Sequence, residues 1–377
     1  MRVLVFNKDH PGLNTGYAKC LRELWIKRLS KKFNIAAYIT VPPIRFFDNY
    51  NGITLYTPYL LSECDIACGG SSLLTHYTNF KADILFTQLD AYVLKEVSEL
   101  AKTKKIEWVA YLPIDYYPIP DYFIKILEPA KKIISMGKWI QKELNAVDYL
   151  YHGIDTTIYK PLGNTKNEIR RKYKNNLVKE GEFLITIIQK NATYKAWVEQ
   201  LKGIKLFIDS NRDIKTKIYI HSFSKGNYHL PTLISLFGLE NYCILCNQYK
   251  YYHCLYTEED MSLIYNLADV NLSVSAEGFG LPIIEAMGCG TPSIVLNFGT
   301  PKELLDSLGL NFKVNIKEYK LTEKYVWKPY PKEEEIARKL EYIANVGSDK
   351  YLTKLVNFSK QFSWDKIAEK LRKILEK

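Results

Sequence analysis

The sequence predicts an α/β protein built from two Rossmann-like, doubly wound domains. A chain of 377 residues is long for a single hydrophobic core. Short β-rich apolar runs alternate with helical patterns along most of its length, as in parallel α/β units. This alternation is interrupted by a polar, charged stretch from residue 163 to residue 181. We therefore expect an N-terminal domain over residues 1–163 and a C-terminal domain over residues 164–363.

The N-terminal domain opens with the pattern of a parallel α/β unit. A β-rich run over residues 3–6 ends in a loop that contains Gly16, and apolar residues at helical spacing then predict a helix over residues 17–32. Further short apolar runs predict the next strands, at residues 35–41, 84–87, 108–112 and 132–135.

The C-terminal domain repeats the same rhythm. Strands are predicted at residues 183–188, 217–221, 243–246, 270–274 and 293–296, and helices at residues 195–211, 230–237, 258–267 and 282–287. An amphipathic helix over residues 364–377 ends the sequence, and we expect it to pack back on the first domain.

The charge balance restricts the class of partner. The formal net charge is +11, which favours an anionic partner: nucleic acid, a membrane surface or phosphate on a small molecule. No apolar run approaches the roughly 18 to 20 residues that a membrane span requires, and the first residues lack the layout of a secretion signal. We expect a cytoplasmic protein.

The predicted helix over residues 17–32 has two interpretations. Its lysines and arginines, combined with Leu24, Trp25 and other apolar residues, are typical of a helix that lies on anionic lipid. The first helix of a Rossmann-like domain also buries an apolar face against its sheet, with solvated lysines on the other face. Peripheral contact with an anionic membrane at the inner membrane surface therefore stays open.

A Cys-x-x-Cys motif raises the question of a metal site. Cys243 and Cys246, with His253 and Cys254 close behind, have the residue types of a zinc site. The apolar residues between the first two cysteines favour a buried strand instead. We expect no metal ligands in this chain.

The stretch from residue 275 to residue 292 carries the clearest chemical signal. Glycines permit a tight turn after a strand, and Pro282 suits the first turn of a helix. Unpaired amides at such a helix start favour phosphate oxygens. Glu277 lies on the turn and Glu285 lies further along, on the helix, so the two carboxylates can border one pocket that binds the hydroxyls of a sugar and of a ribose.

These residues carry a family resemblance. The segment EGFGLPIIE, followed by AMGCGTP, resembles the two-glutamate signature of family 4 retaining glycosyltransferases, which have the GT-B architecture of two Rossmann-like domains facing a cleft. The resemblance is strongest over residues 263–305 and extends to residues 133–161.

The resemblance implies roles for individual residues of the C-terminal domain. Glu277 is expected to hold the hydroxyls of the transferred sugar, and Glu285 those of the ribose. Lys190 and Lys195 are expected to neutralise the donor phosphates, although relatives commonly have Gly-Arg in place of Gln189-Lys190. The turn is expected to meet the diphosphate through Gly278, Phe279, Gly280 and Leu281.

The resemblance also implies two residues in the N-terminal domain. Gly16 matches the glycine that lets the backbone approach the donor phosphate and the acceptor. Asp115 occupies the approximate place of a histidine beside the donor sugar, and we assign it a catalytic role. Its alternative interpretation is a loop carboxylate that caps backbone amides between prolines.

These assignments predict a transferase that needs no metal and no bound cofactor. Negative charge grows on the leaving diphosphate during transfer, and lysines and amides can stabilise it. No Asp-x-Asp pair occurs in the sequence to clamp a divalent ion. We expect retention by same-face substitution, with a nucleotide-sugar donor and a glycan, lipid-linked or protein-linked acceptor.

Two other classes of function are alternatives to the transferase. The first is a GT-B protein that binds a nucleotide sugar without turnover or that regulates a partner. The second is a nucleic-acid-binding protein, which the paired glutamates disfavour because carboxylates repel phosphate backbones. We expect no nucleic acid partner.

Overall fold

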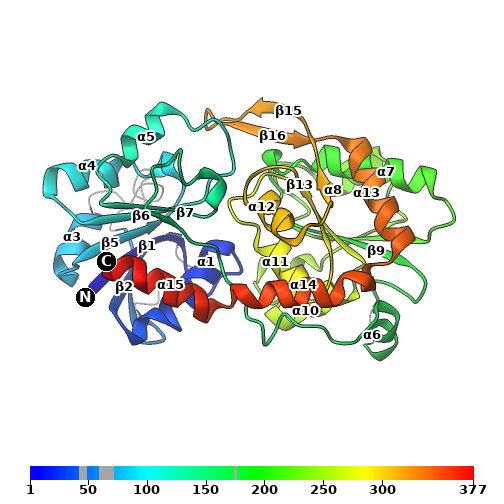
Figure 1. Cartoon of the computed structure of the whole chain (residues 1–377), viewed down its shortest axis with the longest axis horizontal. Helices are drawn as coiled ribbons and strands as arrows, with labels where there is room; N and C mark the ends of the chain where they lie inside the picture. Colours follow the sequence, from blue (N-terminus) through cyan, green and yellow to red (C-terminus); the bar gives the residue numbers. More distant parts are fainter. Residues whose placement is uncertain (42–48, 59–71, 174–175) are drawn as a thin grey trace. The chain divides into compact units, whose positions relative to one another are not determined.

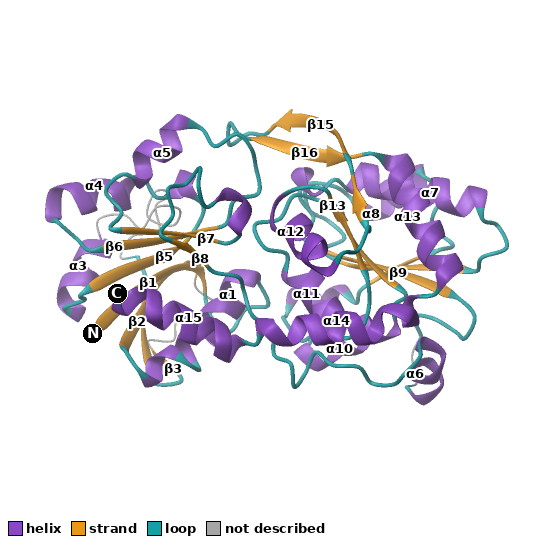
Figure 2. Cartoon of the chain, in the orientation of Figure 1, coloured by secondary structure: helices purple, strands orange, loops and turns teal. Residues whose placement is uncertain are grey.

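The computed structural model describes residues 1–41, 49–58, 72–173 and 176–377. The chain divides into two compact units (Figure 1). Unit 1 comprises Met1–Gly153 together with Trp364–Lys377, and unit 2 comprises Ile154–Ser363. Each unit has its own sheet with helices on both faces (Figure 2), so the predicted α/β class with two doubly wound sheets is confirmed.

The sheet of unit 1 has eight strands in the order β3-β4-β2-β1-β5-β6-β7-β8, all parallel except the pair β3 and β4. Its strands are β1 (Arg2–Asp9), β2 (Asn34–Val41), β3 (Asn49–Tyr50), β4 (Ile53–Tyr56), β5 (Ile84–Gln88), β6 (Trp108–Leu112), β7 (Lys132–Ser135) and β8 (Asp148–Tyr149). Its α-helices are α1 (Gly16–Cys20), α3 (Ser72–Phe80), α4 (Lys95–Lys104), α5 (Asp121–Leu127) and α15 (Trp364–Glu376). Strand β1 lies between β2 and β5, which makes the carboxyl end of β1 the switch point of this sheet.

The predicted helix over residues 17–32 is divided in the structure. The short helix α1 is followed by a π-helical segment, Leu21–Ile26, and a 3₁₀ turn, Leu29–Lys31. The π-helical segment packs against α15, and its Trp25 also meets Phe86 of the sheet. Apolar side chains are therefore buried around much of its circumference, not along the single stripe that a surface α-helix shows.

This burial bears on the expected membrane contact. Leu24 and Trp25 are fully buried and Ile26 is 5% exposed. These apolar side chains are occupied inside unit 1, so a lipid contact through this segment would rest on its basic side chains alone.

The sheet of unit 2 has six parallel strands in the order β11-β10-β9-β12-β13-β14. Its strands are β9 (Phe183–Ile188), β10 (Thr216–His221), β11 (Cys243–Leu245), β12 (Val270–Ser273), β13 (Ser293–Leu296) and β14 (Lys313–Val314). Its α-helices are α6 (Lys166–Lys172), α7 (Trp197–Ser210), α8 (Leu230–Leu236), α9 (Gln248–Tyr252), α10 (Glu258–Leu267), α11 (Leu281–Gly288), α12 (Gly299–Leu308), α13 (Glu333–Val346) and α14 (Leu352–Ser359). Strand β9 lies between β10 and β12, so the switch point of this sheet is at β9 and β12.

Unit 2 also carries an antiparallel hairpin that forms a separate two-stranded sheet. Its strands are β15 (Ile316–Leu321) and β16 (Trp327–Pro331). The residues of β15 are exposed or only half-buried, whereas β16 is buried from its second residue onward.

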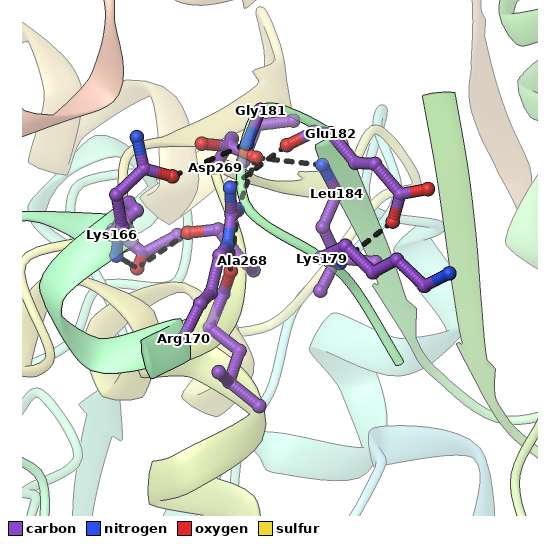
Figure 3. A network of polar contacts seen from close by, with 12 residues as sticks. Lys166, Arg170, Lys179, Gly181, Glu182, Leu184, Ala268 and Asp269 are labelled. Carbon is purple, nitrogen blue, oxygen red and sulfur yellow. Dashed lines mark hydrogen bonds and ion pairs between the residues drawn. The ribbon is translucent and has the colours of Figure 1, made fainter. Parts of the chain in front are cut away.

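A buried polar network fixes the start of β9 and β12 (Figure 3). Lys166 of α6 donates to Thr291 Oγ1 at 2.6 Å and to the carbonyl oxygen of Asn266 at 3.2 Å. Arg170 of the same helix pairs with Asp269 at 2.6 Å, and Asp269 also accepts the Leu184 amide at 2.7 Å. These contacts lie where β9 and β12 begin, and they hold in register the two strands whose far ends carry the candidate site.

The buried Lys166 predicts a pH-dependent stability. Burial lowers the pKa of Lys166 from 10.5 to about 8. Between these two values Lys166 is more protonated in the unfolded chain than in the folded chain, so its contribution to the free energy of unfolding rises with pH in this window. The contribution of Lys166 amounts to about 2 kcal/mol between about pH 8 and about pH 10.

Urea unfolding of the chain and of Lys166→Met at several pH values checks this expectation. The parent should gain stability with rising pH relative to the variant. Parallel pH profiles of the two proteins would show that Lys166 is not the source of the dependence. The comparison stops near pH 10 because burial also raises the pKa of tyrosines such as Tyr265, whose contribution has the opposite sign above that pH.

Among the described residues, none of the helices combines the length and the apolar character needed to cross a bilayer.

Candidate functional site

The candidate site of unit 2 begins at the turn between β12 and α11. Gly280 has φ +90°, in the left-handed region, and a Cβ added there would lie 2.6 Å from Ile283 Cδ1. The backbone conformation therefore favours glycine, and a larger residue would also displace the end of the Ile283 side chain. Pro282 follows in the first turn of α11, so the unpaired amides of this helix start lie at the carboxyl end of the sheet.

The turn is anchored from a neighbouring helix. Thr300, a fully buried residue in the first turn of α12, donates through its hydroxyl to the carbonyl oxygen of Gly278 at 2.9 Å. Phe279 is 3% exposed and packs inward. The backbone from Gly278 to Leu281 is thus held in one conformation by contacts on both sides.

Glu277 on this turn contacts Lys195, which lies in the connection between β9 and α7. Lys195 Nζ lies 2.7 Å from Glu277 Oε1, and the Ser275 hydroxyl donates to the same oxygen at 3.1 Å. Lys195 follows β9 and Glu277 follows β12, so the switch point of the sheet brings them together. The side chains of Lys195 and Glu277 are only 10% and 20% exposed, which limits the screening of this ion pair by solvent.

The backbone of Lys195 is held by two glutamines. Gln189 Nε2 and Gln200 Nε2 both donate to its carbonyl oxygen, at 3.0 and 2.7 Å. The next residue, Ala196, has φ +50° and immediately precedes α7. Lys190 lies on the same connection, with an exposed side chain and a carbonyl oxygen that accepts Trp197 Nε1 at 3.2 Å.

Glu285 lies on α11 in a less polar environment. It is 6% exposed, and its Oε2 accepts a hydrogen bond from the Tyr265 hydroxyl at 3.2 Å. Burial and the Glu285 carboxylate together raise the pKa of Tyr265 well above its usual value, so this phenol remains a donor at neutral pH. Burial and the Glu285 carboxylate also raise the pKa of Tyr159. The sequence did not single out Tyr265.

The two site residues predicted in the first domain lie in unit 1. Gly16 is the first residue of α1, at the switch point of that sheet, and the preceding Thr15 caps the helix by accepting the Ala18 amide at 3.1 Å. Asp115 follows β6. Burial, Asp90 and Tyr92 raise the pKa of Tyr17, which follows Gly16, and Asp115 adds to this shift.

Asp90 is a further candidate functional residue of unit 1, and the sequence alone did not point to it. Its Oδ2 accepts hydrogen bonds from the hydroxyls of Tyr17 and Tyr92, both at 3.1 Å. The residue follows β5, the neighbour of β1, so a search for polar residues after each predicted strand could have found it.

The first three residues of the Cys-x-x-Cys segment form strand β11, as predicted, but the strand is half-buried and not fully buried. Burial raises the pKa of the Cys243 thiol to about 12 and that of Cys246 to about 11, which disfavours the thiolate that zinc requires. Cys246 donates to the carbonyl oxygen of Ser222 at 3.4 Å. Within the described ranges, no group of three or more His, Cys, Asp or Glu residues is arranged to hold a metal ion.

The comparison with protein families identifies one part of this unit. Residues 193–320, which include the turn, Lys195 and both glutamates, match the family model described as glycosyl transferases group 1. No curated protein matches the sequence.

Solved structures, two of which are glycosyltransferases by their printed names, share the fold over nearly the whole chain. HepE from Anabaena in complex with UDP has a TM-score of 0.72 at 14% identity and covers 100% of each chain. A glycosyltransferase from Rickettsia africae has a TM-score of 0.73 at 14% identity, covering 99% of this chain and 97% of its own. WaaG, a glycosyltransferase involved in lipopolysaccharide biosynthesis, has a TM-score of 0.71 at 12% identity and covers 99% of each chain. These structures confirm the predicted fold of two Rossmann-like domains, and the family model supports the resemblance to glycosyltransferases over residues 193–320.

Proposed function

We propose that this protein is a retaining glycosyltransferase that uses a nucleotide-diphosphate sugar. The proposal is supported by the GT-B fold and by the match of residues 193–320 to the model of group 1 glycosyl transferases. The observation that carries the proposal is the pairing of Lys195 with Glu277 beside the turn that precedes α11. A cation and unpaired amides stand next to a carboxylate here. A sugar attached to a diphosphate presents the complementary groups, phosphate oxygens and hydroxyls.

We assign the groups of this site as follows. Glu277 accepts hydroxyls of the transferred sugar, and Glu285, oriented by the Tyr265 hydroxyl, accepts those of the ribose. The amides at Gly280 and Leu281 meet the diphosphate, and Gly278 and Phe279 shape the turn that presents them. Lys195, with Lys190 in a more exposed position, balances the phosphate charge.

The proposed reaction is substitution on one face of the sugar. The bond from the anomeric carbon to the phosphate oxygen breaks, and the acceptor oxygen forms its bond on the face from which the diphosphate leaves. A leaving phosphate oxygen takes the proton of the acceptor hydroxyl. Lys195 and the turn amides stabilise the charge that accumulates on the diphosphate.

The N-terminal residues complete the proposal. Gly16 lets the backbone approach the donor phosphate and the acceptor, and Asp115 acts beside the donor sugar. The HepE structure was solved with UDP and a trehalose-6-phosphate structure from E. coli with UDP-2-fluoro glucose, which supports a UDP-sugar as the first donor to test. The acceptor is a glycan, a lipid-linked sugar or a protein-linked sugar.

Incubation of the protein with a panel of nucleotide sugars and simple sugar acceptors tests the proposal. We expect a glycoside with the anomeric configuration of the donor, as read by proton NMR, and equal rates with EDTA and with added Mg²⁺ because lysine and amide groups replace the metal. Inverted product would contradict retention. Loss of activity in EDTA would contradict metal independence, and binding without turnover would favour a nucleotide-sugar-binding protein.

A further inference from the structure

The hairpin β15–β16 contacts the short turn that carries Lys195. Tyr330 of β16 donates through its hydroxyl to the carbonyl oxygen of Thr193 at 3.3 Å. The ammonium of Lys328, also on β16, lies 4.1 Å from the centroid of the Tyr194 ring. Two neighbouring residues of the turn Thr193–Lys195 are therefore held by two side chains of a single hairpin strand.

These contacts lie in the buried part of β16, whereas β15 and the end of the hairpin are more exposed. Lys328 is 8% exposed and Tyr330 is 7% exposed, whereas Tyr325 near the hairpin end is 81% exposed. A cation on an aromatic face gains most when it is shielded from water. Lys328 and Tyr330 thus make contacts like those of a protein interior, although the hairpin lies outside the six-stranded sheet.

A second lysine fastens the hairpin to the helix that follows the turn. Lys320 of β15 pairs with Glu199 of α7 at 2.8 Å, and its ammonium lies 4.1 Å from the centroid of the Tyr330 ring. Since an isolated two-stranded hairpin has marginal stability, such contacts fix its position. The hairpin, the turn and the first part of α7 therefore form one packed group.

The charge of Lys328 affects Lys195, because both ammonium groups lie near the ring of Tyr194. The ammonium of Lys195 lies 5.4 Å from the centroid of the same Tyr194 ring that Lys328 contacts. Two like charges near one ring repel each other, and the ammonium of Lys328 is closer to the ring centroid than that of Lys195. The repulsion favours the position of Lys195 beside Glu277, at the turn before α11.

We infer that Lys328 is a positioning residue for the donor site and that, through Tyr194, the hairpin β15–β16 sets the place of Lys195. The inference rests on the proposed function, because it assigns Lys195 to the donor diphosphate. Lys328 acts through another side chain and is not itself assigned to the diphosphate.

Calorimetry with nucleoside diphosphates tests the inference, using whichever of UDP, GDP and ADP binds the parent most tightly. Lys328→Met, which keeps the aliphatic stem, should weaken binding by about threefold to thirtyfold, the range of cation–π contacts from exposed to desolvated sites. Lys328→Arg should restore binding, because arginine keeps a cation over the ring. In the Tyr194→Leu background, Lys328→Met should add little, since the ring that transmits its effect is gone.

Two further variants separate the possible failures. Lys317→Met is the matched control, because Lys317 belongs to the same hairpin but pairs with Glu333. This variant should bind the diphosphate with the same constant as the parent. Lys195→Met reports on the proposed function itself. Weakened binding in Lys195→Met with unchanged binding in Lys328→Met, or equal losses in Lys328→Met and Lys317→Met, would overturn the inference alone. Unchanged binding in Lys195→Met, or no binding of any diphosphate by the parent, would overturn the donor site and the inference with it.

Discussion

Glu277→Gln is expected to reduce the rate of sugar transfer by about a hundredfold to a thousandfold, the range seen when one preorganised electrostatic group is removed. The amide has the shape of the carboxylate but lacks its charge, so it holds sugar hydroxyls less strongly and no longer pairs with Lys195. Diphosphate binding should persist or strengthen, because Lys195 is released from its partner. Steady-state kinetics and calorimetry on the same preparations measure both effects.

The control for this variant is Glu259→Gln. Glu259 is an exposed carboxylate in the first turn of α10, and its loss should leave transfer unchanged. Equal rates for Glu277→Gln and the parent would remove Glu277 from the reaction. Loss of diphosphate binding together with activity would indicate that Glu277 supports the turn itself instead of the sugar.

Lys195→Met is expected to weaken diphosphate binding by about tenfold to a hundredfold, the value of one hydrogen bond to a charged group. Lys195 is 8% exposed, and its backbone is fixed by Gln189 and Gln200, so little water is available to replace its charge. The variant also leaves Glu277 without its cation, which adds repulsion between this carboxylate and the diphosphate. Calorimetric titration with the diphosphate provides the measurement.

Lys190→Met is the comparison for this second variant. Lys190 lies on the same connection, but its side chain is exposed, so water and salt screen its charge. Its loss should weaken binding less than the loss of Lys195 does. A larger effect for Lys190, or none for Lys195, would contradict the assignment of Lys195 as the principal cation.

The five strands predicted in each domain were predictable because buried parallel strands are continuous apolar runs, whereas the short strands β3, β4, β8 and β14 were missed. The runs at residues 84–87 and 183–188 correspond to β5 and β9 almost residue for residue. The turn before α11 was also predictable, since glycine and proline report local backbone requirements that do not depend on distant contacts. The roles of the site residues remain predictions.

Other features depend on contacts between distant segments, which a local pattern does not contain. The π-helical Leu21–Ile26 depends on α15, which lies at the other end of the chain. The hairpin β15–β16 was missed because the residues of β15 are exposed or only half-buried and show no alternation of apolar and polar residues. Tyr265 was missed because its partner, Glu285, is on another helix.

A crystal structure of the protein with a bound nucleotide-diphosphate sugar addresses the donor site most directly. We predict phosphate oxygens within hydrogen-bonding distance of Lys195 Nζ and of the amides at Gly280 and Leu281, with sugar hydroxyls donating to Glu277. A nucleotide sugar bound elsewhere, with the Lys195–Glu277 pair undisturbed and the turn before α11 unoccupied, would contradict the account.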